Sequence, residues 1–576
     1  MALAVGRVLC VKGAFFTNVS NSVNIARHLA AHAAVQPGQA ALKIPRGRSG
    51  GRIDYLVLSY AELSAEVAAW RGKLAQAGVR PGDRTLVMVR QGLPLISVVF
   101  ALFELGALPV VIDPGMGRAA FLACVEHSRP RVLVGIPMAR LVSRIFRGAF
   151  ASVEVRVAVS GATTARRTAA GARRPEGDAG ALARDAADAA AILFTSGSTG
   201  APKGVVYTHG QFDAQVRLIS ETYGIAPGEV DLPLLPLFAL FAPALGMTVV
   251  VPEMDPSRPA QAEPARLVQA ILQEGVTTSF GSPTLWGNIV AHCHAKQITL
   301  PTVKRVLCAG APVPLWLWNA IGETLPNGMM HSPYGATEAL PVSTISGEEV
   351  MGGTASQTMQ GAGVCVGHVL GANTVRIIQP VDGDIAGIGD TVAAAVNEIG
   401  EIIVRGPTVT AEYDGLPKAT AAAKIADAES GAVWHRMGDL GYLDALGRLW
   451  FCGRKVERVV TETGIYYPAQ VEPVFETHPE VRRCALVRRV KWGKVQPGVV
   501  IETLQEGMSR DSAGARRLAR ELRELAMQHV HTSAVKVFYF HERLPVDVRH
   551  NAKIHRLALA RWVAEGAVGF ESDPKR

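Results

Sequence analysis

The chain has 576 residues, of which 48% are hydrophobic and 19% charged, and its formal net charge is +9. This length predicts about two to four folding units, and the scattered arginines and lysines argue against a nucleic-acid partner. The seven cysteines are dispersed and form no Cys-x-x-Cys pair. We therefore expect no disulfide framework, no zinc site and a cytoplasmic location.

Residues 1–20 are interpreted as a loose N-terminal extension, because they lack the charged start and the cleavage site of a signal peptide. Farther along, the apolar run 93–114 is the strongest candidate for a membrane span. Glu104 and Gly106 interrupt this run. It therefore predicts a buried helix that leads into a strand at 108–112, and no transmembrane segment.

Helical and strand-like patterns alternate in the first part of the chain. Helical patterns cover 22–34 and 59–77, and strand-like runs cover 84–89 and 131–134. This alternation predicts an α/β fold in which helices cover a parallel sheet. Residues 161–188 are rich in alanine, arginine and glycine, and we interpret them as a surface connection.

The strand series continues at 246–252, 276–280 and 303–307. Runs at 398–405 and 449–451 predict β segments of a smaller, barrel-like region.

A charge-dense segment follows Gly453, and residues 513–529 have the pattern of a charged helix. We predict an extension (1–20), a large N-terminal domain (21–454), and a small, mobile α+β C-terminal domain (455–576).

The loop between the apolar runs that end at Phe194 and begin at Val205 is the most informative segment. It holds four hydroxyl side chains, three glycines and Lys203. Glycines let backbone N–H groups approach a bulky anion, so this composition favours a triphosphate site. The P-loop pattern of common NTPases is absent. The alternative is a flexible polar hairpin.

This loop resembles the phosphate-binding loop of the adenylate-forming synthetases, the superfamily of acyl-CoA ligases and luciferases. Four later segments resemble that family's landmarks in the family's order: Tyr334-Gly-Ala-Thr-Glu338, Arg436-Met-Gly-Asp439, Gly453-Arg454, and Lys553 within His550-Asn-Ala-Lys-Ile554. The resemblance implies a large adenylate-forming domain, a small C-terminal domain with a catalytic lysine, and the cofactors ATP and Mg²⁺.

The resemblance also implies roles for the residues of the phosphate loop. Those that would bind the nucleotide are Thr195, Ser196, Gly197, Ser198, Thr199, Gly200 and Lys203. Ser196, Ser198, Thr199 and Lys203 would cradle the β- and γ-phosphates.

The later motifs would complete the nucleotide site. Tyr334 would stack on adenine beside Gly335, and Gly310-Ala311-Pro312 would line the base. Thr337 would contact the α-phosphate. Glu338 would hold magnesium, since a hard cation prefers carboxylate oxygen. The alternatives are a core tyrosine at 334 and a helix-terminal acid at 338.

Three residues nearer the C-terminus would act on the ribose and the reacting phosphate. Asp439 would accept hydrogen bonds from both ribose hydroxyls, and Arg454 would assist there. Lys553 would stabilise charge at the α-phosphate during catalysis. Taken alone, Gly438-Asp439 is more often a turn, and an isolated lysine is usually a surface residue.

The segment 236–241 departs from the family. The family often places a histidine or an aromatic residue there to gate the thiol of coenzyme A, but this chain has Ala239. We expect Phe238, Ala239 and Phe241 to form an apolar substrate pocket.

Two longer segments, 435–455 and 544–554, resemble the olefin β-lactone synthetases of bacterial long-chain hydrocarbon biosynthesis, and so does 239–259. In that subfamily a long-chain 2-alkyl-3-hydroxy acid is activated as an acyl-adenylate. Its own 3-hydroxyl then attacks to give a β-lactone, AMP and pyrophosphate. The resemblance also implies association with other enzymes of hydrocarbon biosynthesis.

Two alternatives remain at this stage. The first is a long-chain fatty acid–CoA ligase, and the second is a nucleotide-binding interaction protein without catalysis.

Overall fold

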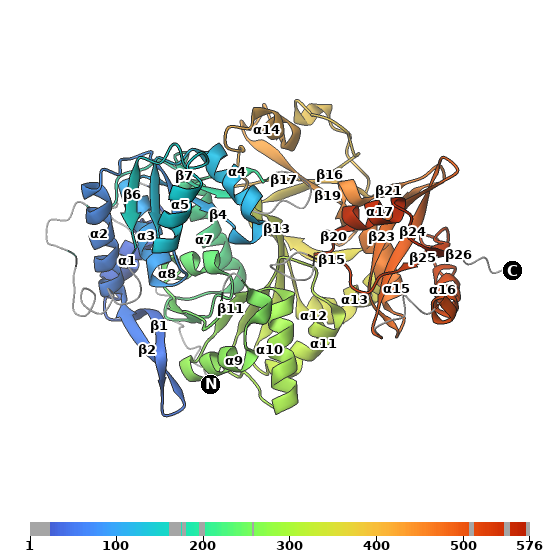
Figure 1. Ribbon diagram of the computed structural model, residues 1–576, viewed down its shortest axis with the longest axis horizontal. Helices are drawn as coiled ribbons and strands as arrows, with labels where there is room; N and C mark the ends of the chain where they lie inside the picture. The colour runs from blue at the N-terminus through green and yellow to red at the C-terminus, as the bar shows by residue number, and fades with distance from the viewer. Residues whose placement is uncertain are drawn as a thin grey trace, which may run out of the picture.

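The computed structural model describes residues 23–159, 174, 180–194, 202–255, 258–505, 512–546 and 553–571. The predicted extension 1–20, residues 195–201 of the phosphate loop and most of the predicted connection 161–188 lie outside the described residues. Figure 1 shows a large part, which contains the blue, green, yellow and lighter orange segments, beside a smaller part in deeper orange and red.

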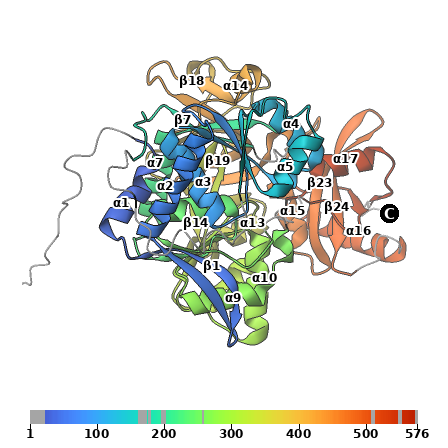
Figure 2. The ribbon, with the colours of Figure 1, turned by 60° about the vertical axis from the view of Figure 1, so that its left-hand side comes forward.

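One sheet of the large part has six strands in the order β6-β5-β3-β4-β7-β8. These strands are β3 (Arg84–Met88), β4 (Leu108–Ile112), β5 (Val132–Gly135), β6 (Val155–Ala158), β7 (Ala189–Phe194) and β8 (Gly204–Thr208). Strands β6 to β7 pair in parallel, and β8 pairs antiparallel with β7. Helices lie beside this sheet (Figures 1 and 2): α2 (Tyr60–Gln76), α3 (Leu93–Leu105), α4 (Arg118–Ser128) and α5 (Pro137–Ile145). The prediction of a parallel sheet covered by helices is confirmed.

Helix α3 and strand β4 account for the apolar run. The helix is buried along almost its whole length and ends where Gly106 adopts a left-handed conformation, with φ of 68°. Glycine reaches this conformation without a steric penalty, so it ends the helix and turns the chain into β4. In the described part of the chain, no helix combines the length and the apolarity needed to cross a bilayer.

A second sheet joins 14 strands. Its central strands pair in parallel, in the order β13 (Met329–Ala336), β12 (Arg305–Cys308), β11 (Thr278–Gly281), β9 (Val230–Asp231), β10 (Thr248–Val250) and β1 (Ala40–Ser49). Strand β2 (Arg52–Ser59) is antiparallel to β1. Beyond β13 the sheet continues with β14 (Ala339–Ser346), β15 (Val364–Val369), β20 (Arg448–Arg454), β19 (Val433–Leu443), β17 (Gly400–Arg405) and β16 (Thr374–Ile378), with β18 (Lys424–Ala426) on β19. Strands β17 and β20 cover the two runs that were expected to belong to a barrel-like region.

Three helices pack on the second sheet: α9 (Pro264–Glu274), α10 (Pro283–Lys296) and α11 (Leu315–Thr324). Helices α1 (Arg27–Val35) and α7 (His209–Tyr223) belong to one core cluster that also includes residues of both sheets. That cluster also includes the segment 236–245, which forms a 3₁₀ turn, η2 (Pro236–Leu240), and a short helix, α8 (Phe241–Ala244).

Residues after 455 build a sheet and a core of their own. The sheet has the order β23 (Val481–Lys491), β24 (Lys494–Thr503), β25 (Val537–Phe540) and β26 (Gly569–Glu571). The helices around it are α15 (Pro468–Glu476), α16 (Ser512–Ala526) and α17 (Arg556–Ala564). Two hydrophobic clusters in this part contain only residues after 455. Helix α15 contacts β20 and α13 (Ala355–Met359), and this contact joins the smaller part to the large one.

His209 at the start of α7 predicts a pH-dependent stability. It is 1% exposed, and its Nδ1 accepts a hydrogen bond of 3.2 Å from the backbone of Ile25. Burial lowers the pKa of His209 to about 4. Between pH 6.5 and 4 the unfolded chain therefore binds more protons than the folded one, so stability falls as the pH falls through this window.

We expect a His209→Asn variant, whose side-chain oxygen can still accept from Ile25, to lose less stability on acidification than the natural chain. The expected difference is about 2–3 kcal/mol between about pH 7 and pH 4.5, from the size of the shift. Urea unfolding of both chains at the two pH values measures it. Equal losses in both chains would contradict a neutral buried His209.

Candidate nucleotide and acyl site

Two parallel strands bring the predicted adenine-binding residues to one edge of the large sheet. Gly310, Ala311 and Pro312 follow the end of β12, and Tyr334 and Gly335 lie near the end of its neighbour β13. The carboxyl ends of parallel strands meet at the same edge, which is where ligands bind in open α/β sheets. A Cβ on Gly335 would lie 2.5 Å from the carbonyl oxygen of Ala339, so the tight return into β14 requires glycine there.

Asp439, Tyr334 and Arg454 form a cluster at this edge, in which Asp439 is buried and the other two are half-buried. Asp439 on β19 faces Arg454 on β20 across the strand pair. The Tyr334 hydroxyl donates to Oδ2 of Asp439 at 2.6 Å, and Nη1 of Arg454 lies 3.0 Å from Oδ1. That ion pair lacks hydrogen-bond geometry, and Oδ1 accepts no hydrogen bond from a described residue. Oδ1 is thus an acceptor available to a ligand hydroxyl, as the predicted ribose role requires.

Burial determines the charges in this cluster. It raises the pKa of Asp439, while the nearby cations Arg454 and Lys553 oppose this rise. Burial also raises the pKa of Tyr334 well above its ordinary value, which keeps the hydroxyl protonated as a donor. The carboxylate of Asp439 therefore depends on the surrounding cations and on this hydrogen bond.

Glu338 lies beside a second set of polar groups. Its Oε1 accepts a hydrogen bond of 2.6 Å from the hydroxyl of Tyr413, and its backbone oxygen accepts one of 2.9 Å from the backbone of Thr410. The buried ammonium of Lys424 donates to the backbone oxygen of Thr410. Burial lowers the pKa of Lys424 to about 7, and the carboxylate of Glu338 counteracts this shift.

The two remaining predicted phosphate residues in the described chain lie close by. The backbone oxygen of Thr337 accepts a hydrogen bond from the hydroxyl of Tyr207. Lys203 is exposed, and its Nζ lies 4.8 Å from the centre of the Tyr413 ring. Tyr413 therefore contacts both the lysine of the phosphate loop and the proposed magnesium ligand. The other predicted loop residues, Thr195 to Gly200, lie outside the described residues.

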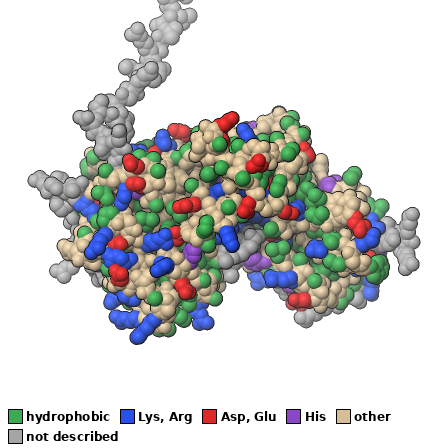
Figure 3. Space-filling view, turned by 90° about the horizontal axis from the view of Figure 1, so that it is seen from above, with side chains coloured by type: hydrophobic (Ala, Val, Ile, Leu, Met, Phe, Trp, Pro, Cys, Tyr) green, Lys and Arg blue, Asp and Glu red, His purple; other side chains and the backbone are tan. Residues whose placement is uncertain are grey.

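Lys553 approaches the site from the smaller part of the chain. It precedes α17 and is close enough to Asp439 and Glu457 to influence the pKa of both. Arg556, three residues later, holds this region in place, with its guanidinium 2.5 Å from Glu472 and 3.2 Å from Glu457. Figure 3 shows the surface hollowed between the large and the small part.

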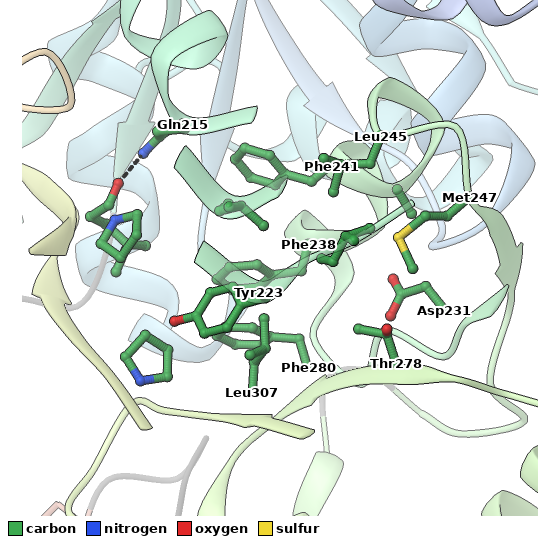
Figure 4. A pocket seen from close by; sticks show the side chains of 16 residues that line it. Gln215, Tyr223, Asp231, Phe238, Phe241, Leu245, Met247, Thr278, Phe280 and Leu307 are labelled. Atoms are coloured by element: carbon green, nitrogen blue, oxygen red, sulfur yellow. Dashed lines mark hydrogen bonds between the residues drawn. The ribbon is translucent and has the colours of Figure 1, made fainter. Parts of the chain in front are cut away.

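An apolar cavity adjoins this edge, and two of the three predicted substrate-pocket residues line it (Figure 4). Phe238 and Phe241 contribute their rings, and the Phe238 ring stacks on Phe280 with a centroid distance of 3.5 Å. Ala239 differs from the expectation. It is 1% exposed, packs into the core and lines neither of the two cavities of this region, because the helical turn points it away from both.

Four site residues were not found from the sequence: Tyr207, Tyr413, Lys424 and His435. Burial lowers the pKa of His435 well below its ordinary value, so this ring is neutral. No short motif identifies a tyrosine or a lysine that is contributed by a distant strand or loop. His435 begins the longer segment 435–455, and that position is the one signal the sequence offered.

Comparisons with known proteins identify the family of this chain. The family model described as AMP-binding enzyme matches residues 29–414. The olefin beta-lactone synthetase of Stenotrophomonas maltophilia is 45% identical over 553 residues, which cover 94% of this chain and 98% of that protein. The protein of the same name from Xanthomonas campestris is 44% identical, with coverages of 95% and 98%.

Solved structures share the fold. The amide bond synthetase McbA from Marinactinospora thermotolerans has a TM-score of 0.75 at 22% identity, covering 94% of this chain and 99% of that one. The O-succinylbenzoate coenzyme A synthetase MenE from Bacillus subtilis, in complex with ATP and magnesium ion, has a TM-score of 0.71 at 22% identity, with coverages of 92% and 98%. The predicted α/β adenylate-forming fold is confirmed, and the chain belongs to the AMP-binding enzyme family.

Proposed function

We propose that this protein uses ATP to activate a long-chain 2-alkyl-3-hydroxy acid and then closes the acid into a β-lactone, releasing AMP and pyrophosphate. The observation that carries the proposal is the convergence of Glu338, Asp439, Arg454 and Lys553 beside an apolar cavity. The similarity to olefin beta-lactone synthetases over nearly the whole chain supports the choice of acid.

In the first step, a carboxylate oxygen of the acid attacks the α-phosphorus of ATP, and pyrophosphate leaves. Asp439 would hold the ribose through its free Oδ1, and Lys553 would stabilise the charge that develops on the α-phosphate. Glu338 would supply a carboxylate ligand for magnesium. This ion needs only one or two protein carboxylates in addition to the phosphate oxygens of the nucleotide. Bound magnesium would neutralise charge on the phosphates.

In the second step, the 3-hydroxyl oxygen attacks the activated carbonyl carbon. The new C–O bond closes a four-membered ring, and the bond between the carbonyl carbon and the phosphate oxygen breaks. AMP leaves with the bonding electrons, and its phosphate takes up the hydroxyl proton. Nucleophile and electrophile belong to one molecule, so the step gains from proximity. The apolar lining around Phe238 and Phe241 would exclude water from the acyl-adenylate.

The smaller part would bring Lys553 to the nucleotide. We infer that residues 21–454 and 455–576 act as two domains, since the hydrophobic clusters of the smaller part contain only residues after 455. Gly453 and Arg454 end strand β20 at this boundary, so Arg454, which would assist at the ribose, lies beside the joint.

Product analysis tests the proposed function. We expect a 2-alkyl-3-hydroxy acid with ATP and magnesium to yield AMP and a β-lactone without coenzyme A, because the acid supplies its own nucleophile. NMR of the products, with and without coenzyme A, measures this, and a plain fatty acid of equal length is the control. Rapid acyl-CoA formation from the plain acid, with no lactone from the hydroxy acid, would instead support a long-chain fatty acid–CoA ligase.

A further inference from the structure

Two apolar cavities, not one, lie beside the segment 236–245. Cavity A, of about 630 Å³, is lined by Gln215, Ile219, Tyr223, Ile225, Asp231, Phe238, Phe241, Ala242, Leu245, Met247, Thr278, Phe280, Leu307, Pro333, Leu340 and Pro341. Cavity B, of about 590 Å³, is lined by Ile25, Val99, Phe100, Phe103, Pro109, Val111, Ala191, Leu193, Phe212, Val216, Leu237, Leu240, Phe241 and Ala244. Both volumes include space that is open to solvent.

A helical segment forms the wall between the cavities. Its two faces line different cavities. In the segment 236–245, Leu237, Leu240 and Ala244 line cavity B, at helical spacings of three and four. Phe238, Ala242 and Leu245 line cavity A at the same spacings. Such spacings place side chains on one face of a helix. Helix α7 repeats the pattern with Phe212 and Val216 on B and Gln215 and Ile219 on A.

Phe241 is the lining residue that both cavities share. In Figure 4 its ring lies on the opposite side of cavity A from Phe280 and Leu307. The cavities therefore meet at one aromatic ring, which separates them.

Both cavities reach toward the nucleotide motifs, from different sides. Cavity A is lined by Pro333 and Leu340, which flank the motif 334–338. Cavity B is lined by Leu193, two residues before Thr195 at the start of the phosphate loop, and by Val111 on the neighbouring strand β4. A molecule with its reacting carbonyl at the nucleotide could thus extend one chain into each cavity.

The polarity of the linings distinguishes the cavities. Every side chain that lines cavity B is apolar. Cavity A contains polar groups, among them Asp231 and Thr278 (Figure 4). Gln215 also lines cavity A, and its buried Oε1 accepts no hydrogen bond from a described residue. An unpaired buried polar group is unfavourable unless a ligand or water satisfies it.

We propose that the two alkyl arms of the acid occupy separate cavities with Phe241 between them, the arm that begins at the 3-hydroxyl carbon in cavity A and the 2-alkyl arm in cavity B. The arm with the hydroxyl belongs in cavity A, because the unpaired Oε1 of Gln215 lies there beside Leu340 and the nucleotide motif, whereas cavity B offers no partner for a hydroxyl. This assignment rests on the proposed function.

A matched pair of variants in α8 tests the assignment. Ala242 lines cavity A and Ala244 lines cavity B, and both are alanines, 1% and 3% exposed, in the same short helix. Ala242→Leu places a larger side chain in cavity A and so reduces its space. Ala244→Leu reduces the space of cavity B by the same side-chain volume. Each variant is measured by pyrophosphate release with three acids: both arms long, a short 2-alkyl arm, and a short 3-hydroxy arm.

Ala244→Leu should lower kcat/KM at least about tenfold for acids with a long 2-alkyl arm and leave the acid with a short 2-alkyl arm near its natural rate. Ala242→Leu should discriminate in the same way against a long 3-hydroxy arm. Turnover of the short-armed acid shows that each variant is folded. Equal losses on all three acids by folded variants, or the reverse pairing of variant and arm, would overturn the proposal.

A second pair covers the case in which either α8 variant does not fold. Val216→Phe in cavity B and Ile219→Phe in cavity A lie one turn apart on α7 and should give the same two selectivities. Measuring both pyrophosphate release and lactone formation distinguishes a failure of this proposal from a failure of the proposed function. Arm selectivity in pyrophosphate release without any lactone would leave the cavities assigned and reject lactone formation, and lactone formation without arm selectivity would do the opposite.

Discussion

Replacing Lys553 by alanine should slow adenylation by about 10²–10³-fold, with a much smaller effect on the affinity for ATP. The reason is that Lys553 lies within electrostatic range of Asp439. In the proposed role it would stabilise the charge that develops on the α-phosphate as pyrophosphate leaves. An interaction that strengthens in the transition state lowers kcat more than it weakens binding. Pyrophosphate release gives kcat, and calorimetry gives the Kd for ATP.

Lys536→Ala is the matched control for this experiment, because Lys536 is an exposed lysine of the same small part and has no predicted role. It should keep the natural rate. If Lys553→Ala adenylates within about twofold of the natural rate, the lysine does not stabilise the transition state.

Glu338→Gln should lower the adenylation rate by about 10²-fold or more and raise the magnesium concentration needed for half-maximal rate. Glutamine can still accept the hydrogen bond from the hydroxyl of Tyr413, so the substitution removes mainly the negative charge. The test is a magnesium titration of pyrophosphate release at saturating ATP.

A Tyr413→Phe variant in the same magnesium titration distinguishes the effect of the Glu338 charge from the effect of the hydrogen bond that positions this carboxylate. It keeps the carboxylate and removes the hydrogen bond of 2.6 Å, so we expect a loss of about tenfold and a nearly unchanged magnesium requirement. A Glu338→Gln variant with the natural magnesium requirement would show that another group holds the ion.

The local elements of the fold could be predicted from the sequence because their signals are local. The apolar run from Leu93 and the glycine at 106 together specify a buried helix, its end and the next strand, and the structure has α3 and β4 there. The strands β17 and β20 were also predicted, but not their place in the large sheet. That place depends on pairing between distant strands, which no local pattern encodes.

The residues of the candidate site also differ in whether a local pattern identifies them. Tyr334 and Asp439 belong to separate motifs, and their direct hydrogen bond joins positions 105 residues apart. Tyr413 and Lys424 belong to no motif, and only the folded chain places them near Glu338. The presence of two apolar cavities was not predicted, although the spacing of Leu237, Leu240 and Ala244 is visible in the sequence and is typical of a helical face.

The separate cores on either side of residue 455 have a consequence for how this chain melts. Cooperative, all-or-none unfolding requires that the packing of one region depend on the packing of the rest, and two cores that share few contacts need not lose their structure together. A single melting temperature then reports on only one of them. The acid sensitivity from His209 belongs to the large part, whereas a ligand that Lys553 and Asp439 hold together would couple both parts and bring their transitions closer.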